Sequence, residues 1–172
     1  MTVRRLLPAD AVPYRALMLD AYALHPDAFT SSAAERAALP LSWWVAPLVP
    51  SPPAGQVVFG AFDGERLVAA AGLEFEAREK ARHKAHLFGM YVAVEARQGG
   101  FGRQLVDAAL EQAAARPGVR LVQLTVTEGN RAAQSLYERC GFAVFGIEPF
   151  AVSLGSTFVS KVHMWRAIDL PG

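Results

Sequence analysis

The sequence predicts one mixed α/β domain over residues 1–172. Short runs rich in β-branched and aromatic residues alternate with segments in which apolar residues recur at helical spacing. The alternation is clearest at 84–116, where an apolar run passes through a glycine-rich turn into an amphipathic pattern. The length suits one domain, and no internal repeat or low-complexity tract divides it. We therefore expect a sheet covered by helices.

Local sequence signals predict where the helices and strands lie, and in the first half of the chain they also predict where elements begin and end. Helices are expected at 10–23, 33–39, 103–116 and 130–140, and strands at 3–6, 56–62, 66–76, 86–94, 119–126, 143–147 and 158–168. Asp10 is a suitable N-cap for the first helix, and Pro40 stops the second. The proline-rich stretch 47–55 can neither continue a helix nor pair in a sheet, so it is a loop. Asp63-Gly64 predicts a hairpin, because both residues tolerate a positive φ.

The second half alternates strands and helices more regularly. The stretch 86–94 is too short and too interrupted by glycine for a helix, so we expect a mostly buried strand. Apolar residues then recur at helical spacing until Pro117. Gly141 is expected to end the last helix in the left-handed conformation, with Phe142 packing back onto it. A loop at 149–156 is expected between the last two strands.

Composition excludes several classes of function. The 17 Lys and Arg balance 16 Asp and Glu to a net charge of +1 without a basic run, so neither nucleic acid nor a membrane is an expected partner. No apolar run spans a bilayer, and Pro8, Asp10 and Pro13 interrupt the N-terminal stretch, so we expect a cytoplasmic protein. The single cysteine, Cys140, excludes an internal disulfide and a cysteine-based zinc site, and no metal is expected. We expect it to be a small buried residue.

The glycine-rich turn has the features of a phosphate cradle. It consists of Arg97, Gln98, Gly99, Gly100, Phe101, Gly102 and Arg103. Its glycines can take a positive φ and let a ligand approach the backbone, and the first helical turn leaves N–H groups without internal partners. Such a turn binds an anion, typically a phosphate. It fits neither the P-loop nor the dinucleotide pattern, and taken alone it is often only a tight connection.

A second segment, at 130–142, makes the pattern specific. Arg97-x-x-Gly100-x-Gly102 resembles the Q/R-x-x-G-x-G/A acetyl-CoA signature of the GNAT family of N-acetyltransferases. The run N-x-x-A-x-x-L-Y-x-x-x-G-F, from Asn130 to Phe142, is similar to the second conserved segment of that family. Both matches stand in the order and spacing of the family, with a strand between them.

This resemblance implies a fold and a co-substrate. The fold would be a central, mostly antiparallel twisted sheet of about seven strands with a splayed central pair, flanked by about four helices. Acetyl-CoA would lie in that splay. The residues that would contact it are Met90, Tyr91, Val92, Arg97, Gln98, Gly99, Gly100, Phe101, Gly102, Arg103, Asn130 and Tyr137. The resemblance also implies homodimerisation through the last strands as an open possibility.

The resemblance implies acetyl transfer by direct attack of an amine on the thioester, so no enzyme nucleophile is required. Tyr137 matches the tyrosine of the family that protonates the departing thiolate; the alternative is a core tyrosine. Asn130 is also a suitable helix N-cap. An amine with a pKa near ~10.4 must lose a proton first. His86, at the position where several members of the family place a catalytic glutamate, is slightly favoured as the base, and Glu74 or Glu76 could act through water. The alternative for Glu74 and Glu76 is a solvated sheet face.

The acceptor is an amine of unknown identity. The segment between the first two helices borders the acceptor pocket in the family, so Phe29, Trp43, Trp44, Glu74 and Glu76 are candidate substrate contacts; the tryptophans can equally fill core. A small amine, an amino acid or an antibiotic-like molecule is slightly favoured, and a peptide N-terminus or lysine remains an alternative. Two other classes stay open: a non-catalytic acyl-CoA-binding regulatory module, and a structural or nucleotide-binding domain with a coincidental glycine turn.

Overall fold

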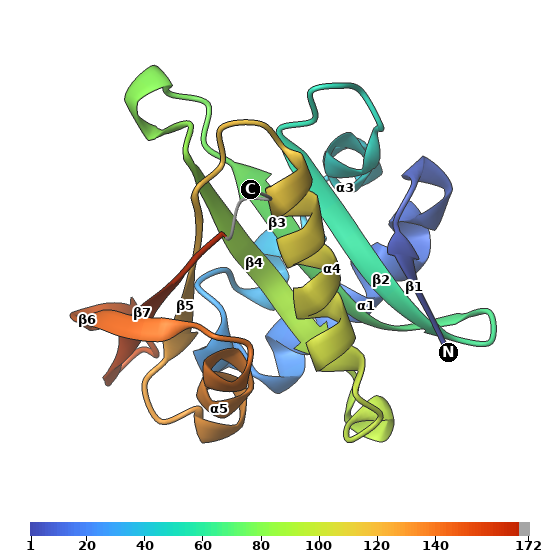
Figure 1. Cartoon of the computed structure of the whole chain (residues 1–172). Helices are drawn as coiled ribbons and strands as arrows, with labels where there is room; N and C mark the ends of the chain where they lie inside the picture. The colour runs from blue at the N-terminus through green and yellow to red at the C-terminus, as the bar shows by residue number, and fades with distance from the viewer. Residues whose placement is uncertain (169–172) are drawn as a thin grey trace.

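The computed structural model describes residues 1–168 and contains a seven-stranded sheet in the order β1-β2-β3-β4-β5-β7-β6 (Figure 1). The strands are β1 (Thr2–Arg5), β2 (Gln56–Asp63), β3 (Arg66–Phe75), β4 (Lys84–Val92), β5 (Leu121–Thr127), β6 (Ala143–Ser153) and β7 (Phe158–Ala167). Neighbouring strands are antiparallel, except for the parallel pair β4 and β5. The predicted mixed α/β fold with a mostly antiparallel sheet is confirmed.

The two central strands pair only where they begin. The register joins residues 84–86 of β4 to residues 121–123 of β5. Beyond His86, β4 continues to Val92 and β5 to Thr127, and Figure 1 shows the two strands diverging. The splayed central pair is therefore present. Beyond the paired residues, the edges of β4 and β5 that face each other are not hydrogen-bonded to each other. Their backbone N–H and C=O groups are therefore available to bond another group.

β4 bulges just before its end. Ala70 pairs with Tyr91 and Gly72 pairs with Phe88, so Gly89 and Met90 together stand opposite one residue of β3. Gly89 has a φ of 58°, which a glycine adopts without a steric penalty. The bulge changes the direction of the backbone at the point where β4 leaves β5.

Helices cover both faces of the sheet. They are α1 (Ala11–Leu24), α2 (Ala33–Ala37), α3 (Leu41–Val45), α4 (Phe101–Ala115) and α5 (Arg131–Arg139). Figure 1 shows α4 across one face and α1 and α3 behind the sheet; we call these the α4 face and the α1 face. Each face has its own hydrophobic core. In α4, Leu105, Val106 and Ala113 are fully buried, which confirms the predicted amphipathic helix.

The end of α5 follows the predicted chemistry. Gly141 has a φ of 88°, and the N–H of Phe142 donates to the carbonyl of Tyr137 at 3.0 Å. This is the left-handed helix end that glycine favours, and it folds the next side chain back over the helix. Phe142 is accordingly buried against the core of the α4 face.

Local signals were misleading at three places. Asp10 does not cap α1: its carboxylate accepts the N–H of Leu7 at 2.8 Å and pairs with Arg4 at 2.9 Å. α4 begins at Phe101 rather than beyond Gly102, because Gly100 takes a φ of 78° and lets the chain enter the helix directly. The expected loop at 149–156 is mostly strand, since register shifts between Glu148 and Val152 let β6 continue to Ser153.

The last two strands form a hairpin with many exposed apolar side chains. They include Val144, Phe145, Ile147, Phe150, Phe158 and Trp165. In Figure 1 this hairpin lies at the side of the sheet opposite to β1. Homodimerisation through these strands, which the family resemblance implies, stays a prediction.

Candidate active site

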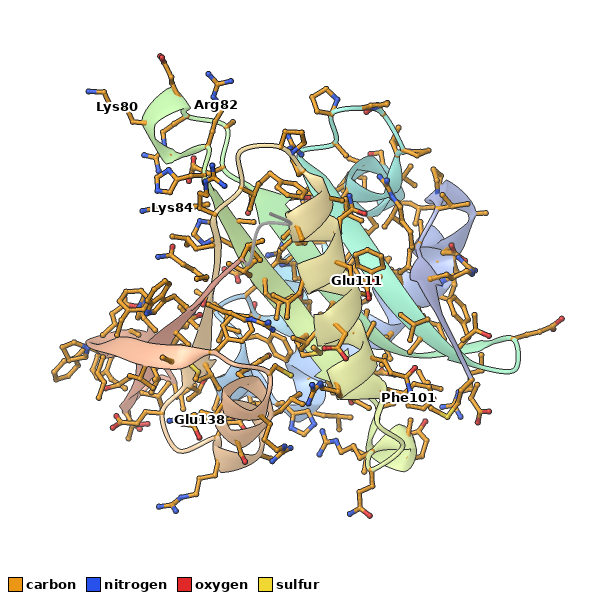
Figure 2. The ribbon with its side chains drawn as sticks, viewed as in Figure 1. Lys80, Arg82, Lys84, Phe101, Glu111 and Glu138 are labelled. Carbon is orange, nitrogen blue, oxygen red and sulfur yellow. The ribbon has the colours of Figure 1, made fainter. Side chains whose placement is uncertain are left out.

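The glycine turn lies at the divergent end of β4. Gln98 and Gly100 have φ angles of 69° and 78°, so two residues of the turn are in the left-handed conformation before α4 begins. Figure 2 shows Phe101 at the first turn of α4 and Glu138 on α5, on the two sides of the splay. Phe101 is buried and anchors the helix, whereas residues 97–100 are exposed. The N-terminal N–H groups of α4, with their partial positive charge, are therefore placed beside the free edge of β4.

Gly102 makes the close approach of α4 and α5 possible. A Cβ at this position would lie 3.0 Å from Cδ2 of Leu136 and 3.9 Å from Cγ2 of Val92. The first contact is tighter than packed side chains accept without moving. A larger residue would therefore fill the space between the turn, β4 and α5.

The two arginines of the turn have protein partners. Arg97 donates to the carbonyl of Val92 at 3.3 Å and to Nε2 of His25 at 3.1 Å, so this imidazole nitrogen is the acceptor. Arg103 donates to both carboxylate oxygens of Asp107 at 3.3 Å and to the carbonyl of Arg139 at 3.5 Å. Arg97 ties the turn to the end of α1, and Arg103 ties α4 to α5.

Tyr137 and Asn130 come from α5 and the residue before it. Tyr137 is 6% exposed, and burial raises the pKa of its phenol above the ordinary value. Its hydroxyl therefore stays protonated at neutral pH and is a donor. Asn130 is exposed and its side chain accepts the N–H of Ala133 at 3.3 Å, so it caps α5.

The residues predicted from β4 split between the two faces. Tyr91 is buried in the core of the α1 face, 5.8 Å from the ring of His25, and burial raises the pKa of its phenol. Met90 and Val92 are half-buried against the core of the α4 face.

A row of polar residues crosses the α1 face. Gln56 stands opposite Glu74, and Glu74 stands opposite His86, so the three side chains share one face of the sheet. Glu76, two residues on, is bonded to Arg78 at 3.0 Å, which holds the pKa of that carboxyl below its usual value. The structure thus brings Glu74 and His86 together and pairs Glu76 elsewhere.

A cavity of about 600 Å³ opens on the α1 face. Its charged lining residues are Arg36 and Glu74, and its rings are Tyr14, Tyr22, Trp43, Trp44 and Phe88. It reaches Phe88 and Gly89, where the bulge of β4 begins. Trp44 lines the cavity and also belongs to the hydrophobic core, since it is only 1% exposed. Phe29 does not line this cavity but packs on Tyr22 with ring centroids 5.0 Å apart.

A model described as the acetyltransferase (GNAT) family matches residues 18–142. The chain belongs to the GNAT acetyltransferase family. A search of curated proteins found no match. The structure resembles that of a GNAT-family acetyltransferase from Streptococcus pneumoniae, with a TM-score of 0.86, 24% identity and coverage of 98% of this chain and 99% of that one.

Two further GNAT-like structures carry the co-substrate. yncA, a putative acetyltransferase from Salmonella typhimurium with its cofactor acetyl-CoA, has a TM-score of 0.80 and 20% identity, covering 100% of this chain and 96% of that one. A phosphinothricin acetyltransferase from Sinorhizobium meliloti, in complex with acetyl-CoA, has a TM-score of 0.77 and 20% identity. The match covers 97% of this chain and 88% of that one. At these identities the likeness shows the fold. In this GNAT chain, residues 97–100 of the glycine turn are exposed, which leaves backbone N–H groups there accessible to a phosphate.

Among the lining residues of the cavity that were not predicted from the sequence, three come from the first two helices. These are Tyr14, Tyr22 and Arg36, which lie in predicted helices but were not assigned to the site. The available signal was the spacing of the tyrosines, about two helical turns apart and thus on one face of α1.

Within residues 1–168, no group of His, Cys, Asp or Glu is arranged to hold a metal ion. No helix in that same range is both long and apolar enough to cross a membrane.

Proposed function

We propose that this GNAT protein transfers the acetyl group of acetyl-CoA to the primary amine of a small molecule by direct attack in a ternary complex. The observation that supports the proposal is that the cavity on the α1 face ends at Phe88 and Gly89. The next residues of β4 form the free edge of the splay, beside the glycine turn. An amine in the cavity and a thioester along β4 would meet at the bulge.

The co-substrate would be held mainly by backbone. The pyrophosphate would accept N–H groups of residues 98–103, and the pantetheine arm would pair with β4 at residues 90–92. A strand N–H near Tyr91 or Val92 would donate to the thioester oxygen as negative charge develops there. Because Arg97 and Arg103 already have protein partners, we assign them first to positioning the turn.

Tyr137 would act on the leaving group. The attacking nitrogen forms a bond to the acetyl carbon as the carbon–sulfur bond breaks, which leaves the electron pair on sulfur. A thiolate whose conjugate acid titrates near ~8.5 accepts a hydrogen bond from the Tyr137 phenol. Burial raises the pKa of this phenol, so its proton stays available for donation to the sulfur.

Glu74 is supported as the group that removes the proton from the amine. It lines the cavity, whereas His86 stands beside it in the register without lining the cavity. A carboxylate in this position can take the proton directly or through a water molecule. His86 remains the alternative, and the two are separated by mutation below.

Ligand-dependent thermal stability tests this function. Acetyl-CoA and CoA should raise the melting temperature with concentration, ATP should do so less, and Gly100→Glu and Gly102→Glu should remove the shift. Gly146→Glu is the matched control, since a Cβ there meets no atom within 4 Å. Thiol release with a panel of amines then measures turnover. A wild-type protein that is stabilised by none of the ligands would refute the proposal.

A further inference from the structure

The acceptor cavity contains one positive and one negative side chain that are not paired with each other. Arg36 of α2 and Glu74 of β3 both line it. Neither occurs among the ion pairs of residues 1–168. Two opposite charges held apart in one concave site complement a ligand that itself carries both signs.

Aromatic rings hold the guanidinium of Arg36. Its Cζ lies 4.4 Å from the centroid of Trp43 and 5.9 Å from that of Tyr22. Stacking of this kind favours arginine and fixes the plane of its nitrogen donors. The neighbouring Glu35 forms no ion pair with it, and that carboxylate accepts the backbone N–H of Ser32 at 2.9 Å. Arg36 is thus a positioned cation without a carboxylate of its own.

The polar atoms around Arg36 that have no partner are donors. Nε of Arg36 and Nε1 of Trp44 are buried, and neither has a hydrogen-bond partner among the described residues. Trp44 is 1% exposed and lines the cavity. A buried donor without an acceptor is unfavourable, and a guanidinium can satisfy only an acceptor. The group that this end of the cavity lacks is an acceptor with negative charge.

We propose that the acceptor is a free α-amino acid with an apolar or aromatic side chain, whose carboxylate binds Arg36. The inference rests on the proposed acetyl transfer. The carboxylate would receive the donors of Arg36, and the amine would face Glu74 near the bulge of β4. The side chain would lie among the rings of Tyr14, Trp43 and Phe88. Carboxylate recognition by a planar guanidinium is specific in geometry as well as charge.

Matched pairs of acceptors test the carboxylate directly. The panel is phenylalanine, tryptophan, methionine and leucine, each compared with its own amide, in an assay of CoA release. A carboxylate next to the amine favours the protonated ammonium, so a larger fraction of the amide than of the acid has an unprotonated amine at neutral pH. A preference for the acid must therefore come from binding. For at least one pair we expect kcat/KM of the acid to exceed that of the amide by about tenfold or more.

Arg36→Met should reduce that ratio to near one while keeping the apolar stem against Trp43. Arg82→Met, at an exposed arginine of the loop between β3 and β4 that does not line the cavity, should leave the ratio unchanged. A wild type that prefers no acid over its amide would overturn the inference. So would a preference that persists in a folded Arg36→Met protein.

Binding without turnover separates this inference from the proposed function. In a Trp165→Phe background, Trp43 and Trp44 are the remaining tryptophans, and both line the cavity. The amino acids should change their fluorescence with saturation, and the amides should bind more weakly. Such binding without acetyl transfer would leave the carboxylate site standing and refute the transferase. Acetyl transfer to the amides with no preference for the acids would support the transferase and refute the carboxylate site.

Discussion

The rings of Tyr137 and Phe142 pack edge to face with their centroids 6.0 Å apart. The contact is a consequence of Gly141, whose left-handed conformation returns the chain over the end of α5. The same turn that ends the helix thus fixes the ring of the proposed acid. Removing the hydroxyl of Tyr137 should leave this packing intact.

Tyr137→Phe should lower kcat by about 10²- to 10⁴-fold, because the departing thiolate loses its donor. The melting temperature and the acetyl-CoA-dependent stabilisation should remain close to those of the wild type, since the ring contact is kept. CoA release and thermal unfolding measure the two effects. A variant that turns over at the wild-type rate would exclude Tyr137 as the acid.

Gly102→Ala should raise the KM for acetyl-CoA about tenfold, because the new Cβ would meet Leu136 at 3.0 Å and displace the turn from α5. Leu136→Ala in the same protein removes the colliding atom and should restore most of the loss. Gly146→Ala is the control in open space. If Leu136→Ala brings no recovery, contact between α4 and α5 is not what selects glycine.

Glu74→Gln should lower kcat/KM about 100-fold or more, and His86→Gln less than about tenfold, if Glu74 takes the proton from the amine. Both substitutions remain on the polar row of the α1 face, and thermal unfolding controls for folding. The reverse order of effects would assign the base to His86. Equal small effects would show that the amine reaches the thioester without either group.

Asp10→Asn should cost about 1 kcal/mol of unfolding free energy at pH 7, since it breaks a partly exposed pair with Arg4. The hydrogen bond from Arg4 holds the pKa of Asp10 below its ordinary value. The stabilisation is therefore present above about pH 3.9, the unfolded value, and is lost as the pH falls through the lower folded value. Denaturant unfolding of both proteins from pH 7 to pH 2 measures it. A difference that grows on acidification would contradict the assignment.

Much of the fold could be predicted because its signals are local. The alternation of short apolar runs with helical patterns placed all seven strands and the long helices. The glycines at 100 and 141 were recognisable because left-handed backbone has few alternatives to glycine. The prediction of acetyl-CoA chemistry rested on motifs of the same local kind, a turn entering one helix and a short run along another.

Errors arose where a distant residue determined the outcome. Asp10 has the residue type of a helix cap, but Arg4 of the neighbouring strand attracts its carboxylate. The segment after Glu148 looks like a loop, yet pairing with β7 keeps it in the sheet. Local propensity is a weak preference, and an ion pair or a ladder of backbone hydrogen bonds outweighs it.

The sequence by itself determined the order of the elements, the glycine turn and the helix that carries Tyr137, since backbone conformation at glycine and apolar spacing depend on neighbours along the chain. Only the tertiary structure decided the cavity on the α1 face. Arg36 and Trp43 come from short helices, whereas Glu74 comes from a strand, and folding places all three around one space. These side chains are far apart in the sequence and become neighbours only on folding, so no sequence spacing could predict that they line one cavity.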